Sequence, residues 1–66
     1  MNNLRYYREK AGLSQYDLAE KTGIEQSLIS RAEKGVKDLP GQRWKVMAKV
    51  LECTVDDLLG AGKEGE

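Results

Sequence analysis

The amino-acid sequence predicts an all-α fold, a compact domain of five short helices that contains a helix-turn-helix. Three observations support this fold class. Apolar residues recur at intervals of three and four along several segments, which is the spacing of one face of a helix. Glycine follows four of these segments, where a helix commonly ends. Two segments open with a capping box, one at Ser14 with Asp17 and one at Thr54 with Asp57.

The first helix is expected over residues 3–11, with Asn2 or Asn3 as its N-cap and Gly12 at its end. Arg8 lies on the side of this helix that should face the core. A buried arginine needs an acidic or polar partner, because burying an unpaired charge is costly. The apolar residues expected on this side, or just after the turn, are Leu4, Tyr7, Ala11 and Leu13.

The stretch from Ser14 to Gly35 reads as two helices joined by a turn at Gly23. A glycine at this position can adopt a left-handed backbone without a Cβ clash, so the first of these helices should stop there. Ala19 is small and lies one turn before Gly23. It lets the second helix, expected over residues 26–34, cross close over the first, as a helix-turn-helix requires.

A helical wheel of residues 26–34 places Ile29, Ala32 and Glu33 on the buried side. The opposite face carries two hydroxyls and two cations, from Ser27, Ser30, Arg31 and Lys34. A face without large apolar groups and without acids suits an anionic partner. An ordinary solvated face is an equally good interpretation of the wheel alone.

Residues 36–41 are expected to form a loop, because Pro40 and Gly41 interrupt any continuing helix. An amphipathic helix follows, whose apolar stripe is Trp44, Met47, Ala48 and Leu51. A short last helix opens at Thr54, closes at Gly60 and should bury Val55, Leu58 and Leu59. The sequence thus predicts one domain over residues 1–60 and a flexible tail over residues 61–66.

The composition favours a binding domain over an enzyme. The 66 residues contain no histidine and one cysteine, Cys53, so neither an intrachain disulfide nor a usual zinc site is expected. The neighbouring carboxylates Asp56 and Asp57 would point about 100° apart on a helix, which makes a poor acid–base pair. No cofactor, metal or small-molecule substrate is expected. Neither a signal peptide nor a membrane span is visible, and a cytoplasmic location is expected.

The net charge of +0 weighs against a nucleic-acid partner, since such domains are often basic. The distribution of charge points the other way. Acids gather near the C-terminus, at Asp56, Asp57, Glu64 and Glu66. Cations lie on or just after the 26–34 helix, at Arg31, Lys34 and Lys37.

The helix-turn-helix stretch resembles the lambda-repressor/Cro-type family, also called XRE-like or Cro/C1-type. The residues that carry this resemblance are Gln15, Leu18, Ala19, Gly23, Ile29 and the Glu33-Lys34-Gly35 ending. The flanking segments match in order and spacing from about Leu4 to Leu59. The resemblance implies a homodimeric regulator of transcription, a repressor, that binds double-stranded DNA with the 26–34 helix in the major groove.

The resemblance also implies roles for individual residues. Gln15 would contact a phosphate and brace the recognition helix. Gln26, Ser27 and Arg31 would reach base edges, whereas Ser30 and Lys34 would lie at the periphery or on phosphates. Lys37 is a further DNA-binding candidate, because its charge lies just after the recognition helix. Arg8 and Glu33 would pair across the core.

Two residues depart from the family pattern. Glu25 stands at the cap of the recognition helix, where serine or threonine is usual, and its charge is unfavourable near phosphate. Leu28 stands where polar residues are common, and it would touch either a thymine methyl or a neighbouring subunit. The rival interpretation is a protein-interaction module of the same fold, such as an antitoxin-like partner. Net neutrality and Glu25 favour it, whereas the cations of the outward face favour DNA.

Overall fold

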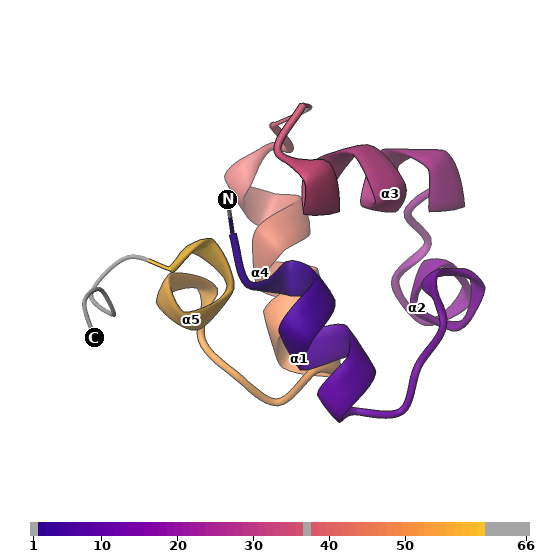
Figure 1. The fold of residues 1–66 in the computed structure, drawn as a ribbon, viewed down its shortest axis with the longest axis horizontal. Helices are drawn as coiled ribbons and strands as arrows, with labels where there is room; N and C mark the ends of the chain where they lie inside the picture. The colour runs from indigo at the N-terminus through magenta and orange to yellow at the C-terminus, as the bar shows by residue number, and fades with distance from the viewer. Residues whose placement is uncertain (1, 37, 61–66) are drawn as a thin grey trace.

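The computed structural model describes residues 2–36 and 38–60, and it places five helices in them (Figure 1). The expected tail, residues 61–66, lies outside the described residues. The fold class is all-α, as predicted, and no strand occurs in the described part of the chain. None of its helices is long and apolar enough to span a membrane. The helices are α1 (Leu4–Lys10), α2 (Gln15–Thr22), α3 (Gln26–Lys34), α4 (Gly41–Val50) and α5 (Val55–Leu59).

The chain before α1 ties three helices together. Asn3 is the N-cap by position but makes no cap hydrogen bond with its side chain. Instead, the Asn2 carboxamide oxygen accepts from the Leu4 N–H at 3.0 Å, and its Nδ2 donates to the Ala32 carbonyl of α3 at 2.7 Å. The Asn3 N–H donates to the Leu58 carbonyl of α5 at 2.7 Å. The start of α1 is thereby fixed against both α3 and α5.

The first helix is shorter than predicted, and the expectation for Ala11 is wrong. α1 ends at Lys10, and Ala11 is its C-cap and exposed to solvent. Because Ala11 already belongs to the turn, helical spacing no longer decides which way its side chain points. Leu4 is fully buried, and Tyr7 and Leu13 are half-buried against the core.

The helix-turn-helix forms as predicted. Ser14 and Asp17 make the capping box of α2, with each side chain accepting from the other residue's backbone N–H at 3.0 Å. Gly23 ends α2 in the left-handed conformation at φ 77°, and its N–H donates to the Ala19 carbonyl at 2.8 Å. α3 begins three residues later, at Gln26. This short turn fixes the angle at which α3 leaves α2 (Figure 1).

The last two helices correct two expectations. Gly41, expected at the end of the loop, is the first residue of α4, and Pro40 is the N-cap of that helix. Proline suits the start of a helix, because its fixed φ is compatible with a helical entry. Leu59 is 42% exposed, whereas Leu58 is fully buried and Val55 is half-buried. Neighbouring residues on a helix point about 100° apart, so a helix of five residues turns only one of the two leucines inward.

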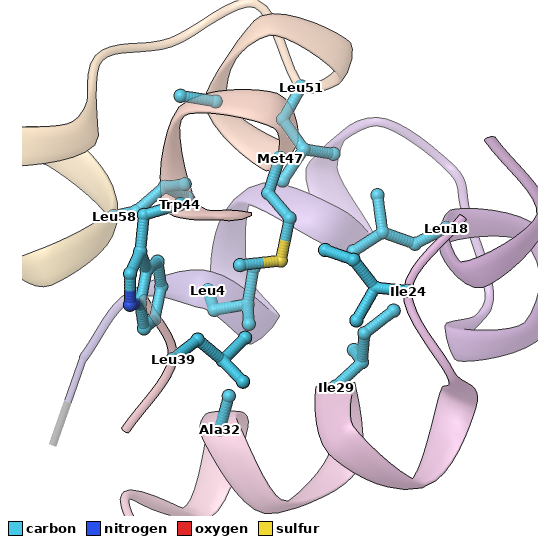
Figure 2. Close-up of a cluster of buried hydrophobic side chains, with 11 residues drawn as sticks. Leu4, Leu18, Ile24, Ile29, Ala32, Leu39, Trp44, Met47, Leu51 and Leu58 are labelled. Carbon is cyan, nitrogen blue, oxygen red and sulfur yellow. The ribbon is translucent and has the colours of Figure 1, made fainter. Parts of the chain in front are cut away.

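The core draws apolar side chains from each of the five helices and from the segments between them. Figure 2 shows Met47 reaching into the middle of this cluster, between Leu4 and Ile24. Trp44 covers one end of the cluster with its indole ring and is 4% exposed. The buried apolar residues are Leu4, Leu18, Ile24, Ile29, Ala32, Leu39, Trp44, Met47, Ala48, Leu51 and Leu58.

Candidate nucleic-acid interface

α3 presents its polar face to solvent and its apolar face to the core. Ile29, Ala32 and Glu33 are buried, as the helical wheel predicts. The side chains on the opposite face are at least partly free to meet a ligand. Ser27, Arg31 and Lys34 are exposed, and Ser30 is half-buried. Figure 1 shows α3 along one edge of the molecule, with the other helices to one side of it. This placement leaves its outward face uncovered by the described residues.

A buried ion pair fixes α3 against α1. The Arg8 Nε donates to one oxygen of the Glu33 carboxylate at 2.5 Å, and Nη2 donates to the other at 3.3 Å. The two residues are 8% and 6% exposed. Arg8 Nη1 also donates to the Leu13 carbonyl at 2.8 Å, so the turn after α1 shares the same guanidinium. This is the pair that the family resemblance implies.

Two glutamines extend the polar contacts from this ion pair to the start of α3. Gln15 Nε2 donates to the Glu33 carboxylate at 3.0 Å. The Gln15 side-chain oxygen accepts from Gln26 Nε2 at 2.6 Å. Gln15 thus links the last turn of α3 to its first residue, and it holds the Gln26 carboxamide beside the N-terminus of α2.

Beside the outward face of α3 lies a depression of about 350 Å³ between α1, α2 and α3. Its exposed cations are Arg5 from α1 and Lys34 from α3, and Ser30 of α3 also lines it. Arg5 is bound on its own helix to Glu9, whose carboxylate oxygen lies 3.0 Å from the Arg5 Nε. The hydrogen bond with Glu9, followed by the attraction of its charge, raises the pKa of Arg5.

The sequence interpretation missed Arg5. Its position on α1 gives no sign that it lies near α3, because the two segments are far apart in the chain. The buried Arg8–Glu33 pair offered an indirect signal. A pair that brings α1 against α3 also brings the residue one turn before Arg8 close to the last turn of α3.

The two departures from the family pattern have visible consequences. Glu25 is the N-cap of α3 and makes no cap hydrogen bond with its side chain, as a weak cap would behave. Its backbone carbonyl accepts from the Leu28 and Ile29 N–H groups. Leu28 is half-buried and packs against the core cluster, a role that neither sequence-based alternative included. Lys37, the last cation proposed for this surface, lies outside the described residues.

The comparison with protein families agrees with this geometry. Residues 4–58 match the model of a helix-turn-helix family of the XRE/lambda-repressor type. The chain belongs to this helix-turn-helix family. Its members are domains of the type found in DNA-binding regulators of transcription. Comparison with curated proteins and with solved structures gave no significant match.

Proposed function

We propose that this helix-turn-helix protein binds double-stranded DNA in a sequence-specific manner and represses transcription, with α3 in the major groove. The observation that carries the proposal is the charge of α3. Its acid, Glu33, is buried and paired with Arg8, while Arg31 and Lys34 stay exposed on the outward face. The surface offered to a ligand is therefore cationic, although the net charge of the chain is +0.

Direct reading of bases is assigned to Gln26, Ser27 and Arg31. The Gln26 carboxamide gives one of its two N–H groups to Gln15. Its second N–H and its oxygen remain for the N7 and N6 groups of an adenine. The contact with Gln15 therefore orients Gln26 without using up its capacity to read a base. Arg31 carries a planar fork that matches the O6 and N7 acceptors of guanine.

Phosphate contacts are assigned to residues around the groove-facing surface. Ser30, Lys34 and Arg5 border the depression beside α3, where two cations and a hydroxyl suit a phosphodiester. Gln15 lines the same depression and has a second N–H that its hydrogen bond to Glu33 does not use. Lys37 is assigned to this group from its position in the sequence alone. These contacts would supply affinity and fix the orientation of α3 without reading bases.

The DNA-bound form is proposed to be a homodimer. One short recognition helix reads few base pairs, so a single domain of this size would discriminate weakly. A two-fold dimer would bind half-sites about one helical turn apart, ~34 Å. α5 and the nearby loop are the proposed interface, on the resemblance to the family, and the exposed Leu59 adds apolar area on α5. We assign the protein to the cytoplasm and give it no catalytic role.

Selection of binding sites from random duplexes tests the proposal. Enriched sites with two related half-sites, bound with a steep loss of affinity as salt rises, are expected, because cationic contacts release counterions from DNA. The matched control is a variant with Arg31→Ala and Lys34→Ala, which removes the cations but no core contact. Enrichment of a lone half-site that a monomer binds at full affinity would exclude the dimer. Absence of any enriched site would contradict sequence-specific binding.

The second candidate is a protein-interaction module of the same fold. Two observations favour it, the net charge of +0 and the exposed Glu25 at the N-terminus of α3, where it would approach phosphate. Binding to random-sequence duplex DNA at low salt separates the two candidates. DNA binding that disappears at high salt supports the regulator. No DNA binding at low salt supports the interaction module.

A further inference from the structure

A second depression, of about 750 Å³, lies away from α3. It is bordered by the C-terminal ends of α1 and α4 and by Lys21 near the end of α2, and no described residue of α3 lines it. In Figure 1, the C-terminal ends of α1 and α4 lie at the bottom of the view, whereas α3 lies at the top. A molecule bound here would leave the outward face of α3 free.

The floor of this depression is apolar. Tyr7, Leu13 and Val50 are half-buried side chains that pack against the core on one side and line the depression on the other. They come from α1, from the turn after it and from α4, so the fold brings three separate segments to one surface. An apolar side chain that covered this floor would remove its exposed area from water, which favours binding.

The rim carries charges of both signs. Lys10 and Lys21 supply two exposed cations, and Glu52 supplies an exposed carboxylate. The Lys10 ammonium lies 6.0 Å from the centre of the Tyr7 ring and 5.8 Å from that of Tyr6. Contacts of this kind favour a position of Lys10 above the aromatic edge of the floor. The floor is thus flanked by groups that would each attract a charge of the opposite sign.

Glu52 has a backbone conformation that suits glycine better. Its φ is 57°, in the left-handed region, where a Cβ atom is strained against the backbone. The other four helices are followed at the equivalent point by a glycine, with φ between 76° and 79°. A residue held in such a conformation beside a depression suggests that its side chain has a use. The carboxylate at the rim is what glycine would lack.

We propose that this depression docks a peptide segment of a partner protein, one in which a large apolar side chain lies between an acidic and a basic residue. The apolar side chain covers Tyr7, Leu13 and Val50. The acid pairs with Lys10 and Lys21, and the base pairs with Glu52. Charge complementarity selects this occupant, because a purely acidic segment would be repelled by Glu52 and a purely basic one by the lysines.

The position of the depression implies that the partner and DNA can bind together. Only this simultaneous binding rests on the proposed function. Peptide binding itself is measured without DNA, so its failure is distinguishable from a failure of DNA binding.

The test is a selection of displayed random peptides against the full chain, followed by measurement of the enriched peptides on a Lys10→Glu, Lys21→Glu variant. The enriched peptides should share an apolar residue flanked by an acid and a base. Added to the labelled chain, such a peptide should shift amide resonances at the end of α1, at Lys21 and at residues 50–52. The double lysine variant should weaken binding by about tenfold or more, since like charges then meet at the rim. Lys45→Glu, on the exposed side of α4 outside this depression, is the matched control and should change little.

A second variant, Glu52→Gly, is expected to fold, because glycine suits the left-handed backbone at this position. It should weaken the selected peptide by about threefold, as expected for an exposed ion pair. The same variant should not weaken a version of the peptide in which the basic residue is replaced by alanine. The proposal is overturned if no peptide is enriched, if the amide shifts map to α3, or if the lysine variant binds equally well. It is also overturned if the lysine variant abolishes self-association of the chain, because the occupant is then a second copy.

Discussion

The Arg8 guanidinium on α1 donates two hydrogen bonds to the Glu33 carboxylate on α3, and more than nine-tenths of each residue is buried. Gln15 adds a third hydrogen bond to the same carboxylate. Three side-chain hydrogen bonds from α1 and α2 to the helix proposed to enter DNA therefore converge on one acid. Removal of its charge would leave Arg8 buried without a counter-ion, which costs more than the pair itself contributes.

We expect Glu33→Ala to lower the free energy of unfolding by ~3–5 kcal/mol, the usual cost of breaking a buried pair. Urea denaturation measures the change. A double variant, Arg8→Met with Glu33→Leu, should recover most of the loss, because no uncompensated charge remains. The control is Glu9→Ala, which breaks the exposed pair with Arg5 and should leave the midpoint nearly unchanged. An unmoved midpoint for Glu33→Ala would show that the pair contributes nothing.

The capping box of α2 predicts a pH dependence of stability. The Ser14 backbone N–H, followed by the Ser14 side chain, holds the pKa of Asp17 below its ordinary value. A carboxyl whose pKa is lowered by folding stabilises the folded state above its unfolded pKa of about 3.9. That stabilisation is lost as the pH falls through the folded pKa.

Thermal unfolding of Asp17→Asn from about pH 6 down to pH 2 tests this point. The variant should be less stable than the wild type near pH 6, and the difference should shrink as the pH falls. Glu20→Gln removes a carboxylate from the same helix that makes no cap contact, and it is the matched control. A difference that stays constant down to pH 2 would mean that the cap does not depend on the charge of Asp17.

The sequence correctly predicted those helix ends that are set by one or two capping residues. Ser14 and Thr54 cap because their hydroxyls reach the N–H three residues on, and Gly23 and Gly35 end helices because only glycine is unstrained there. The expectation for Ala11 was wrong because α1 ends one residue earlier than predicted. The expectation for Leu59 was wrong because neighbouring residues on a helix point about 100° apart, so only Leu58 of the two leucines faces the core. Glu52 could not be found at all, since its residue type gives no sign of a left-handed backbone.

The candidate site also has a part that local sequence predicts and a part that it does not. The outward face of α3 follows from helical periodicity, which is local, and Ser27, Arg31 and Lys34 are exposed where the wheel placed them. The depression that Arg5 shares with Lys34 depends on how α1 packs against α3. Such a juxtaposition is set by the whole core, and no spacing in the sequence encodes it.

The left-handed backbone at Glu52 predicts a stabilising substitution. Glu52→Gly should raise the free energy of unfolding by about 1 kcal/mol, because it removes the clash of Cβ in this conformation. Part of the gain is offset by the larger freedom of glycine in the unfolded chain. Glu52→Ala, which keeps the Cβ but removes the carboxylate, is the control and should stay close to the wild type in denaturant. Equal stabilisation by both variants would assign the effect to the charge and not to the backbone.

Gln15 is predicted to couple the ion pair to base reading. Gln15→Ala removes a hydrogen bond to the Glu33 carboxylate and frees the Gln26 carboxamide. The loss of a hydrogen bond to a charged group should lower the free energy of unfolding by ~1.5–3 kcal/mol. It should also relax the preference for the base that Gln26 reads.

A double-mutant cycle with Gln26→Ala measures that coupling on the selected operator. The two substitutions should cost less together than the sum of their separate effects, since each removes the same hydrogen bond. Additive effects would show that Gln15 acts on DNA only through its own bond to a phosphate.

Arg31 and Lys34 are predicted to divide discrimination and affinity between them. Both are exposed on the outward face of α3, but Arg31 lies one turn after Ser27, and Lys34 is the last residue of the helix. The planar fork of Arg31 can therefore reach the floor of the groove and bind guanine through two hydrogen bonds, an interaction that discriminates by about 1–3 kcal/mol. The ammonium of Lys34 lies beside the depression shared with Arg5, where a phosphate is the suitable ligand.

Arg31→Ala should thus relax the preference at one position of each half-site. Lys34→Ala should weaken all sequences alike and lower the slope of log affinity against log salt by about one for each phosphate that the lysine no longer neutralises. Both variants are measured against a panel of single-base changes in the selected operator, at several salt concentrations. Lys45→Ala, an exposed lysine of α4 that lines neither of the two depressions, controls for the removal of one positive charge. If Arg31→Ala weakened every sequence equally and Lys34→Ala changed the preferred base, α3 would enter the groove in a different register, with its C-terminal end on the bases.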